Sequence, residues 1–363
     1  MSPSPAPPTP TTTPVTDRRR AAYAAELALG TDRFQEPRRT DCPWCGATGP
    51  RLRLTTSDLV QRKPGRFTLD ECGRCGHVFQ NPRLTPEGLS FYHWDAAEAG
   101  PGGPAPRGRR RLRAAARAVP GAFEPESWLD VGTGHGDFPD VAREFFPYTA
   151  FDGLDATPRV VRAREAGRIE EAHIGRLTAP ATAARLRARY DVVSLLHQLE
   201  RTPDPRAELA GALGALRAGG YLLLELTDPG CLYAGLLGRW WLPHTQPGHL
   251  HLLPVGNVCA ELEAGGCEVV SVDRRAHAPV DLGAAAELVR GCVLPEGDVP
   301  WREAGVRPVW GRVRGAAGPV VGAARVADGL LAPLLRRTRF SNTYRVVARL
   351  RPGGAPSRSS PRP

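Results

Sequence analysis

Four of the eight cysteines in the chain form two closely spaced pairs. Cys42 and Cys45 lie in the run Cys-Pro-Trp-Cys-Gly, and Cys72 and Cys75 lie in Cys-Gly-Arg-Cys-Gly. Two such turns place four thiolates at the corners of a tetrahedron, which is the arrangement that Zn²⁺ takes in a closed structural site. Because four sulfur ligands leave no open position for water, we expect a zinc ion that holds the fold and takes no part in the chemistry.

Other roles for these cysteines remain open. A redox pair would not need a second copy, and disulfides are rarely kept in the cytoplasm. His77 follows the second pair and could in principle replace one cysteine as a ligand. The other four cysteines lie in apolar contexts, where core packing is their expected role: Cys231, Cys259, Cys267 and Cys292.

A glycine-rich turn follows an apolar segment in the middle of the chain. Trp128–Val131 has the character of a buried strand, Gly132-Thr133-Gly134-His135-Gly136 forms a tight turn, and Asp137 begins a helix. Backbone without Cβ atoms can approach a ligand closely, and the N–H groups at the helix start point toward it. The turn predicts a ligand site, with a purely structural turn as the alternative.

An acidic residue ends the next expected strand. Asp155 lies 19 residues after Gly136, where a carboxylate can accept hydrogen bonds from both hydroxyls of a ribose. The turn departs from the dinucleotide pattern Gly-x-Gly-x-x-Gly, and a negative residue at Asp137 would repel a pyrophosphate at the helix end. The two features together predict a pocket for a nucleoside ligand without phosphates, which points away from NAD.

Several histidines follow expected strands, at the edge where substrates bind in open α/β sheets. Histidine is the best general base near pH 7, so these side chains could accept a proton from a substrate. Each of these histidines could equally be a hydrogen-bonded structural residue. His244 belongs to this group, and the candidate catalytic residues that we select from it are His197, His249 and His251.

Elements that would position these residues are visible from Ser127 onward. Short apolar runs alternate with amphipathic stretches, which predicts a parallel sheet covered by helices. The expected strands are 128–131, 150–154, 169–174, 190–196, 221–226, 267–272 and, late in the chain, 344–350. The expected helices are 137–146, 158–166, 179–189, 205–217 and 255–264.

A chain of 363 residues exceeds what one hydrophobic core usually supports, so we expect several units. The Gly- and Pro-rich stretch 99–106 is the expected hinge. The expected units are a disordered tail at 1–20, a zinc-binding module at 36–95, a ligand-binding domain at 107–275, a C-terminal extension at 276–352 that completes the sheet, and a disordered tail at 353–363.

Composition is that of a globular protein, with 41% apolar, 7% aromatic and 24% charged residues, and it excludes a collagen or a coiled coil. The net charge of +10 is carried almost wholly by arginine, since Lys63 is the only lysine. Arginine suits phosphate, but so extreme a ratio in a chain rich in Ala, Gly and Pro indicates genomic base composition more than a nucleic-acid surface.

No transmembrane segment is expected, because prolines interrupt the longest charge-free stretch, 240–260. The N-terminus lacks the apolar core of a secretory signal, which favours a cytoplasmic location. The segment Leu330–Phe340 combines apolar residues with a basic cluster. It could contact a membrane or a lipid-linked substrate, or simply pack on the sheet.

Taken in order, these motifs resemble the class I S-adenosylmethionine-dependent methyltransferases. The likeness covers about residues 40 to 350 and includes a fourth-strand motif, a Leu-x-x-Gly-Gly entry to strand five, a Pro-x-His-Leu segment, and an Asn-Pro-Arg that closes the four-cysteine segment: Tyr190–Pro205, Leu216–Leu224, Pro247–Leu252 and Asn81–Arg83. The resemblance implies a doubly wound, mostly parallel, seven-stranded Rossmann-like sheet with a small N-terminal zinc-ribbon-like module. One departure is that the family's Glu-His is Glu200-Arg201 here, which makes His197 the substitute candidate.

The resemblance also implies the residues that would bind S-adenosylmethionine. The glycine turn would line its methionine and ribose part, Asp130 would order its amino group, Asp155 would bind the ribose, and residues after the third strand would lie by the adenine. The full set is Asp130, Gly132, Thr133, Gly134, Gly136, Asp155, Ala156, Arg176 and Leu177.

Three functions stay open at this point. The first is methyl transfer to a small molecule, such as a sugar, a nucleotide-sugar or a cell-surface or secondary-metabolite intermediate. The second is an RNA methyltransferase, which a zinc ribbon and the basic charge would suit, although the fourth-strand region lacks the Asn/Asp-Pro-Pro-Tyr/Phe motif of amino-group methylation. The third is a non-catalytic protein that keeps a relic nucleoside pocket. The oligomeric state is not predicted.

Overall fold

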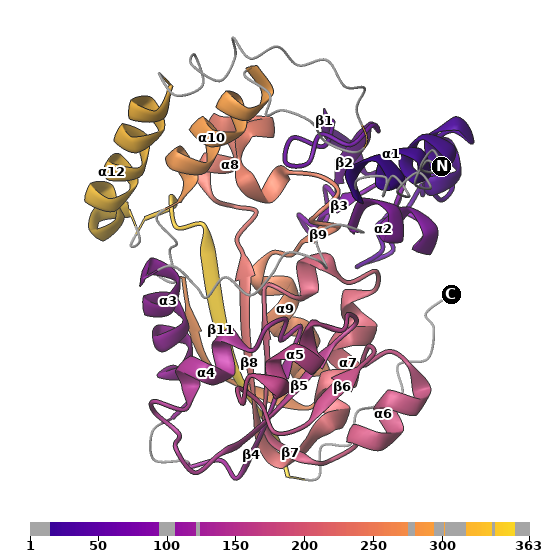
Figure 1. Ribbon diagram of the computed structural model, residues 1–363. Helices are drawn as coiled ribbons and strands as arrows, with labels where there is room; N and C mark the ends of the chain where they lie inside the picture. Colours follow the sequence, from indigo (N-terminus) through magenta and orange to yellow (C-terminus); the bar gives the residue numbers. More distant parts are fainter. Residues whose placement is uncertain are drawn as a thin grey trace, which may run out of the picture.

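The structure is a computed structural model. It describes residues 15–93, 106–120, 124–274, 280–293, 301, 317–335 and 338–352. The chain forms two sheets, with the larger one in the lower half of Figure 1 and the smaller one above it. The expected hinge and the C-terminal tail lie largely or wholly outside the described residues.

The larger sheet has seven strands in the order β10-β11-β8-β7-β4-β5-β6. All neighbouring pairs from β6 to β8 are parallel, and β11 is antiparallel to both β8 and β10. This confirms the expected mostly parallel, seven-stranded α/β fold. The strands are β4 (Ser127–Val131), β5 (Ala150–Asp155), β6 (Ala172–Ile174), β7 (Tyr190–Leu196), β8 (Leu216–Thr227), β10 (Cys267–Asp273) and β11 (Thr343–Leu350).

The central strands of this sheet are buried on both faces. Successive residues of a strand point to opposite faces, and Trp128 and Leu129 accordingly belong to two different hydrophobic clusters. Such two-sided burial explains why the strands are almost continuously apolar. The helices that accompany the sheet are α3 (Pro106–Ala116), α4 (Asp137–Ala142), α5 (Arg159–Glu165), α6 (Pro180–Leu186), α7 (Pro205–Ala215) and α9 (Val255–Ala264).

The smaller sheet is antiparallel, with the order β1-β2-β3-β9. Its first three strands come from the N-terminal region: β1 (Arg51–Thr56), β2 (Phe67–Glu71) and β3 (Val78–Gln80). Its fourth, β9 (His251–Leu252), comes from the segment between β8 and β10 of the larger sheet. The cysteine-bearing sheet is therefore completed by a strand that the sequence did not predict.

An aromatic cluster lies beside the smaller sheet. Tyr23, Phe34, Phe91 and Tyr92 are all buried, and Lys63 donates a hydrogen bond to the Phe91 carbonyl oxygen at 2.8 Å. The cluster joins α1 (Val15–Ala28) to α2 (Pro86–His93). The expectation of a tail over residues 1–20 needs correction, because α1 begins at Val15 and is fixed by Tyr23, which is 1% exposed.

Three further helices lie above the larger sheet in Figure 1: α8 (Leu232–Leu237), α10 (Asp281–Val293) and α12 (Gly318–Leu335). Short 3₁₀ turns occur at Asp32–Phe34, Leu199–Arg201, Gly238–Trp240 and Leu242–His244. Asp328 of α12 accepts hydrogen bonds from the backbone N–H groups of Leu282 and Gly283, at 3.0 and 2.8 Å, and so ties α12 to the start of α10.

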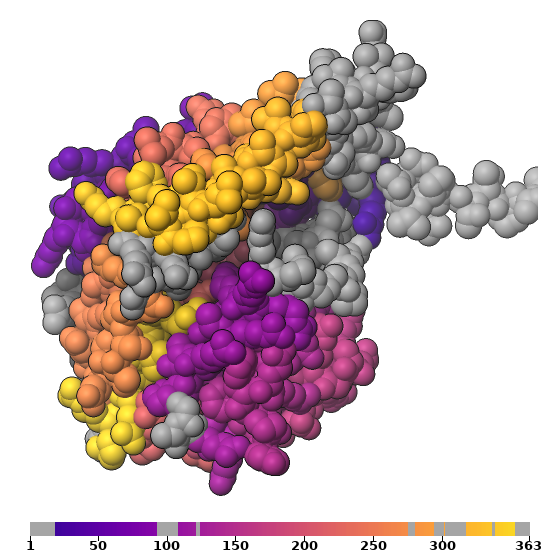
Figure 2. Space-filling model, turned by 90° about the vertical axis from the view of Figure 1, so that its left-hand side faces the viewer, coloured from indigo at the N-terminus to yellow at the C-terminus, as the bar shows by residue number. Residues whose placement is uncertain are grey.

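Among the described residues, one helix, α12, is long and apolar enough to cross a membrane, and 11% of it is buried. It lies along the top of the face seen in Figure 2. Leu330 and Leu334, in the segment that we singled out as basic and apolar, are 73% and 70% exposed. The C-terminal part of α12 is therefore largely exposed, except for Leu335, which packs against a cluster that includes Leu69 and Val78 of the smaller sheet.

Candidate functional site

The four cysteines expected to bind zinc lie together. In each pair, the glycine after the second cysteine donates its N–H to the carbonyl oxygen of the first cysteine at 2.9 Å, from Gly46 to Cys42 and from Gly76 to Cys72. Both glycines have φ +69°, which a side chain would strain. The two turns are thus near copies of each other, and each directs two sulfur atoms to one point.

The sulfur atoms fit a tetrahedral zinc ion. All four lie within 4.8 Å of one another; Cys42 Sγ is 3.7 Å from Cys75 Sγ, and Cys45 Sγ is 3.6 Å from Cys72 Sγ. A Zn–S bond of about 2.3 Å in a regular tetrahedron separates the sulfurs by about 3.8 Å. Burial raises the pKa of Cys42, and that of Cys75 to about 11. A bound metal would therefore have to displace protons from these thiols.

His77 and His251 connect the cysteine cluster to the larger domain. His77 Nδ1 lies 3.7 Å from Cys42 Sγ, and its Nε2 is 3.1 Å from His251 Nδ1. The other ring nitrogen of His251 is 3.3 Å from the carbonyl oxygen of Pro203. Both nitrogens of His251 are engaged in this chain of contacts, so the structure places this candidate base with the cysteine module.

The glycine-rich turn meets the end of β5. Gly132, Gly134 and Gly136 have φ of +76°, +54° and +77°, the left-handed region that favours glycine. The N–H of Gly134 donates to Asp155 Oδ2 at 3.0 Å. The structure therefore brings together the turn and the carboxylate that the sequence predicted to share a ligand.

Around this turn, the available space differs from glycine to glycine. A Cβ atom on Gly132 would lie 2.3 Å from the Gln198 side chain, and one on Gly136 would lie 3.0 Å from Arg168. A Cβ atom on Gly134 would meet no heavy atom of a described residue within 4 Å. The turn is thus packed at its two ends and open at its centre, which leaves room for a ligand at Gly134.

Asp155 is also fixed by hydrogen bonds from Thr157, two residues later. It is 6% exposed, and its Oδ1 accepts hydrogen bonds from the N–H and the hydroxyl of Thr157 at 2.8 and 2.6 Å. Ala156, the next residue, is exposed. A carboxylate fixed by two hydrogen bonds on one oxygen presents the other toward the turn.

Asp130 lies one residue before the end of β4 and is 4% exposed. Its Oδ1 accepts a hydrogen bond from the Ser194 hydroxyl at 2.6 Å, and Ser194 in turn accepts one from the Trp128 indole at 2.9 Å. Burial, with a further contribution from Asp155, raises the pKa of Asp130 to about 7, although the hydroxyls of Ser194 and Thr133 oppose the shift. Asp130 is therefore poised between its neutral and charged forms near neutral pH.

Arg168 secures the far side of the turn. Its Nη1 donates to the carbonyl oxygen of His135 at 3.0 Å and to Asp137 Oδ1 at 2.7 Å. The negative charge of Asp137, which we took to disfavour a pyrophosphate, is thus paired with a guanidinium. Asp137 paired with Arg168 repels a pyrophosphate less than a free carboxylate would. The spacing of the glycines still differs from the dinucleotide pattern.

The residues expected near an adenine ring lie after β6. Arg176 is half-buried, whereas Leu177 is 1% exposed and belongs to the core cluster on one face of the sheet. A Cβ atom on Gly211 of α7 would lie 2.7 Å from the Cβ of Leu177. Leu177 is therefore a packing residue in this structure, and its contact with an adenine stays a prediction.

His197, directly after β7, is placed between two buried carboxylates. Its Nδ1 is 3.0 Å from Glu200 Oε1, and its Nε2 is 3.5 Å from Glu225 Oε1. Burial would lower the pKa of His197, but the two carboxylates outweigh burial and raise it above its usual value. His197 also has φ +54°, a strained backbone for a non-glycine residue.

Sequence reasoning missed the second carboxylate beside His197 and the arginines paired with it. Glu225 lies in β8 and is 1% exposed; it accepts a hydrogen bond from Arg345 Nε of β11 at 3.0 Å, and Arg111 of α3 is 3.5 Å away. These cations and His197 lower the pKa of Glu225 to about 2 despite its burial. The available signal was a lone glutamate inside the apolar run Leu222–Leu226.

His249 interacts with the same carboxylate as His197. Burial and the Arg201 guanidinium lower the pKa of His249 to about 3, and Glu200 opposes the shift. Its Nδ1 is buried without a hydrogen-bond partner among the described residues. His244 lies elsewhere, with Nδ1 2.8 Å from the carbonyl oxygen of Gly238. Of the candidate bases, the structure therefore brings together His197 and His249.

Comparison with known proteins identifies the larger domain. Residues 106–272 match the model of a family described as a methyltransferase domain. None of the curated proteins matches this chain. Residues 106–272 contain the glycine turn, Asp130, Asp155, and both His197 and His249.

Solved structures similar to this chain include the [4+2]-cyclase SpnF, which is 16% identical, with 72% of this chain and 93% of that chain covered and a TM-score of 0.44. Another is a SAM-dependent methyltransferase from Archaeoglobus fulgidus, at 15% identity, 71% and 98% coverage and a TM-score of 0.42. The N-methyltransferase NodS from Bradyrhizobium japonicum is 12% identical, with 68% and 88% coverage and a TM-score of 0.38. At these identities and TM-scores the neighbours do not identify the acceptor.

Proposed function

Because residues 106–272 form a domain of a methyltransferase family, we propose that this protein transfers a methyl group from S-adenosylmethionine to a small-molecule acceptor. The assignment of the methyl donor rests on the contact between Gly134 and Asp155. An open backbone turn and a buried carboxylate face each other there, 3.0 Å apart. A nucleoside ligand needs this combination, a close backbone approach and an acceptor for ribose hydroxyls.

The proposed donor residues divide the ligand between them. The turn from Gly132 to Gly136 lies against the methionine and ribose part, Asp155 accepts the ribose hydroxyls, and Asp130 accepts a hydrogen bond from the amino group. Arg176 and Leu177 lie on the adenine side. S-adenosylmethionine supplies an electrophilic methyl group on a sulfonium, so the main task of the protein is to hold donor and acceptor in line at near-attack distance.

We assign proton acceptance to His249 and a positioning role to His197. Because two carboxylates raise its pKa, His197 is favoured as an imidazolium, and in that form it cannot accept a proton. His249 is neutral near pH 7, and its Nδ1 has no partner among the described residues. The lowered pKa makes the free ring a weak base, so this role requires that Glu200 stabilises the protonated ring. A proton from an acceptor hydroxyl can move to this nitrogen, and Glu200 then stabilises the cation.

A structural zinc ion completes the proposal. The four sulfurs of Cys42, Cys45, Cys72 and Cys75 would hold it, and the fit of their spacing to a zinc tetrahedron supports the choice of metal. The ion would stabilise the smaller sheet. Since β9 of that sheet begins two residues after His249, the module would also position the acceptor side.

Substituting Gly134 by alanine tests the donor site, because the new Cβ would enter the space reserved for the ligand. Gly167 is a matched control: its φ is +68°, and a Cβ there also meets nothing described within 4 Å. Both variants should lower the free energy of unfolding by about 1 kcal/mol through backbone strain. Only Gly134→Ala should weaken binding of S-adenosylhomocysteine, by more than about tenfold in isothermal titration.

The outcomes of this experiment separate cleanly. Equal affinities of the two variants for S-adenosylhomocysteine would remove the ligand from the centre of the turn. A wild-type protein that does not bind S-adenosylhomocysteine at all would refute the proposed enzyme and favour a domain that has lost its donor.

A further inference from the structure

A cavity of about 820 Å³ lies between the two sheets and is separate from the glycine turn. One side is formed by the smaller sheet, with Arg53 of β1, Glu71 of β2, and Gly76 of the second cysteine turn. The other side is formed by Asp228, directly after β8, and by Arg274, directly after β10. The cavity therefore opens at the carboxyl edge of the larger sheet, where substrates bind in this architecture.

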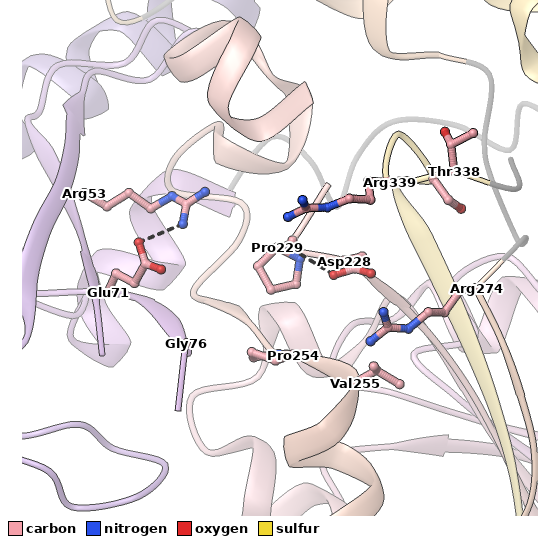
Figure 3. Close-up of a pocket in the computed structure, with 12 residues that line it drawn as sticks. Arg53, Glu71, Gly76, Asp228, Pro229, Pro254, Val255, Arg274, Thr338 and Arg339 are labelled. Carbon is pink, nitrogen blue, oxygen red and sulfur yellow. Dashed lines mark hydrogen bonds and ion pairs between the residues drawn. The ribbon is translucent and has the colours of Figure 1, made fainter. Parts of the chain in front are cut away.

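Three arginines point into this cavity. Figure 3 shows Arg53, Arg274 and Arg339 approaching from different sides toward the space beside Asp228 and Pro229. Arg53 Nη1 is already paired with Glu71 Oε2 at 2.9 Å. Neither Arg274 nor Arg339 has an ion-pair partner among the residues that the structure describes. Two guanidiniums thus face an open space without a carboxylate partner in the described part of the chain.

Asp228 lines the same cavity but forms no ion pair with either of them among the described residues. Its Oδ1 accepts a hydrogen bond from the N–H of Gly230 at 2.9 Å and so stabilises the turn after β8. With three guanidiniums and two carboxylates on its walls, the cavity keeps an excess of positive charge. Arginines converging on a concave site are the chemistry that recognises an anion.

From this geometry we propose that the cavity binds the phosphate or diphosphate group of a phosphorylated methyl acceptor. Arginine presents a planar fork of donors that matches phosphate oxygens in a bidentate manner. A volume of about 820 Å³ lies in the range of sites for whole metabolites, so a diphosphate ester fits with room for the organic part. This inference rests on the proposed function, because it names the class of acceptor for that reaction.

A short path of hydrogen bonds joins the cavity to the acceptor side. The N–H of Thr227, the residue before Asp228, donates to Glu200 Oε1 at 2.9 Å. The same oxygen holds His197, and Glu200 also interacts with His249. An acceptor anchored by its phosphate in the cavity can therefore extend its reacting end toward this pair of histidines.

Inorganic pyrophosphate titrated into the zinc-loaded, full-length protein tests the proposal. The double variant Arg274→Gln/Arg339→Gln should weaken pyrophosphate binding at least tenfold and leave the affinity for S-adenosylhomocysteine unchanged. Arg185→Gln/Arg187→Gln, at exposed positions on and just after α6, removes the same charge as a matched control and should change neither affinity. If the first double variant does not fold, each single variant should still show a measurable loss.

A third variant should change the pyrophosphate affinity in the opposite direction. Asp228→Asn keeps the acceptor oxygen for Gly230 but removes a negative charge from the wall, so pyrophosphate binding should tighten by about threefold. A merely structural role of the arginines would not produce this gain.

Several results would overturn the proposal. They are a wild-type protein that does not bind pyrophosphate, equal pyrophosphate affinities of the arginine variants and the wild type, or malonate binding as tightly as pyrophosphate, which would reassign the cavity to a carboxylate. If pyrophosphate binds as expected but S-adenosylhomocysteine does not, the anion site stands while the proposed methyl transfer falls. If S-adenosylhomocysteine binds and the arginine substitutions do not change the pyrophosphate affinity, the anion site is refuted and the proposed methyl transfer stands.

Discussion

Asp130 is the residue whose charge state the fold controls most directly. A carboxylate in water is ionised at neutral pH, but burial under the glycine turn raises the pKa of Asp130 to about 7. An ammonium group bound beside it would restore the charged form. The donor proposed here carries such a group, so its binding and the ionisation of Asp130 are thermodynamically coupled.

This coupling predicts how donor affinity depends on pH. Below pH 7 the neutral form of Asp130 dominates in the free protein, and binding must first remove its proton; above pH 7 the carboxylate is already present. Affinity for S-adenosylhomocysteine should therefore rise by up to about tenfold between pH 6 and pH 8. Isothermal titration at the two pH values measures it, and Asp130→Asn should abolish the pH dependence. An unchanged affinity in the wild type would contradict the contact.

At the scale of elements, the parts that the sequence predicted are those with a clear local period. The strand expected at 190–196 and the helix expected at 255–264 have those bounds in the structure, as β7 and α9. The proximity of the glycine turn to Asp155 also follows from sequence, because consecutive parallel strands end at the same edge.

Two features that sequence reasoning missed, β9 and the surroundings of His197, depend on contacts between distant segments. β9 has two residues, too few for a period, and exists because β3 offers Val78 and Phe79 as pairing partners. The carboxylate pair around His197 depends on Arg345, which lies 120 residues after Glu225 and approaches it only because β11 inserts beside β8. Single-sequence patterns carry no information about such pairings.

Two of the candidate bases, His249 and His251, lie just before and at the start of β9, so their substitutions can be compared directly. His249 has an unpartnered ring nitrogen, whereas His251 is engaged by His77 and by the carbonyl oxygen of Pro203. Assayed with the methyl acceptor, His249→Gln should lower kcat by about 100-fold or more without changing the affinity for S-adenosylhomocysteine. His251→Gln should lower the melting temperature instead, with kcat per folded molecule retained. The reverse pattern would move the base to His251.

On the scale of the whole molecule, the two sheets are one structural system. β9 pairs with β3 on one side, and on the other side the N–H of Leu250, just before β9, donates to the carbonyl oxygen of Glu200 at 2.6 Å. His249, the strand that pairs with the smaller sheet, and Pro254 and Val255 of the cavity wall therefore lie within one short segment, 249–255. If the cysteine module loses its structure, we expect this segment, and with it His249, to become more mobile.

Metal removal puts this coupling to the test. The purified protein should contain one zinc per chain by elemental analysis, and Cys45→Ser should lower the free energy of unfolding by at least about 3 kcal/mol, because a structural zinc site contributes directly to folding. Hydrogen exchange should speed up at residues 249–252 as well as in the cysteine turns, while the amides of β4 and β5 stay protected. Cys292→Ser, outside the cluster, should leave all three measurements unchanged. Exchange confined to the cysteine turns would mean that β9 is held by the larger domain alone, and a zinc content far below one per chain would refute the metal assignment.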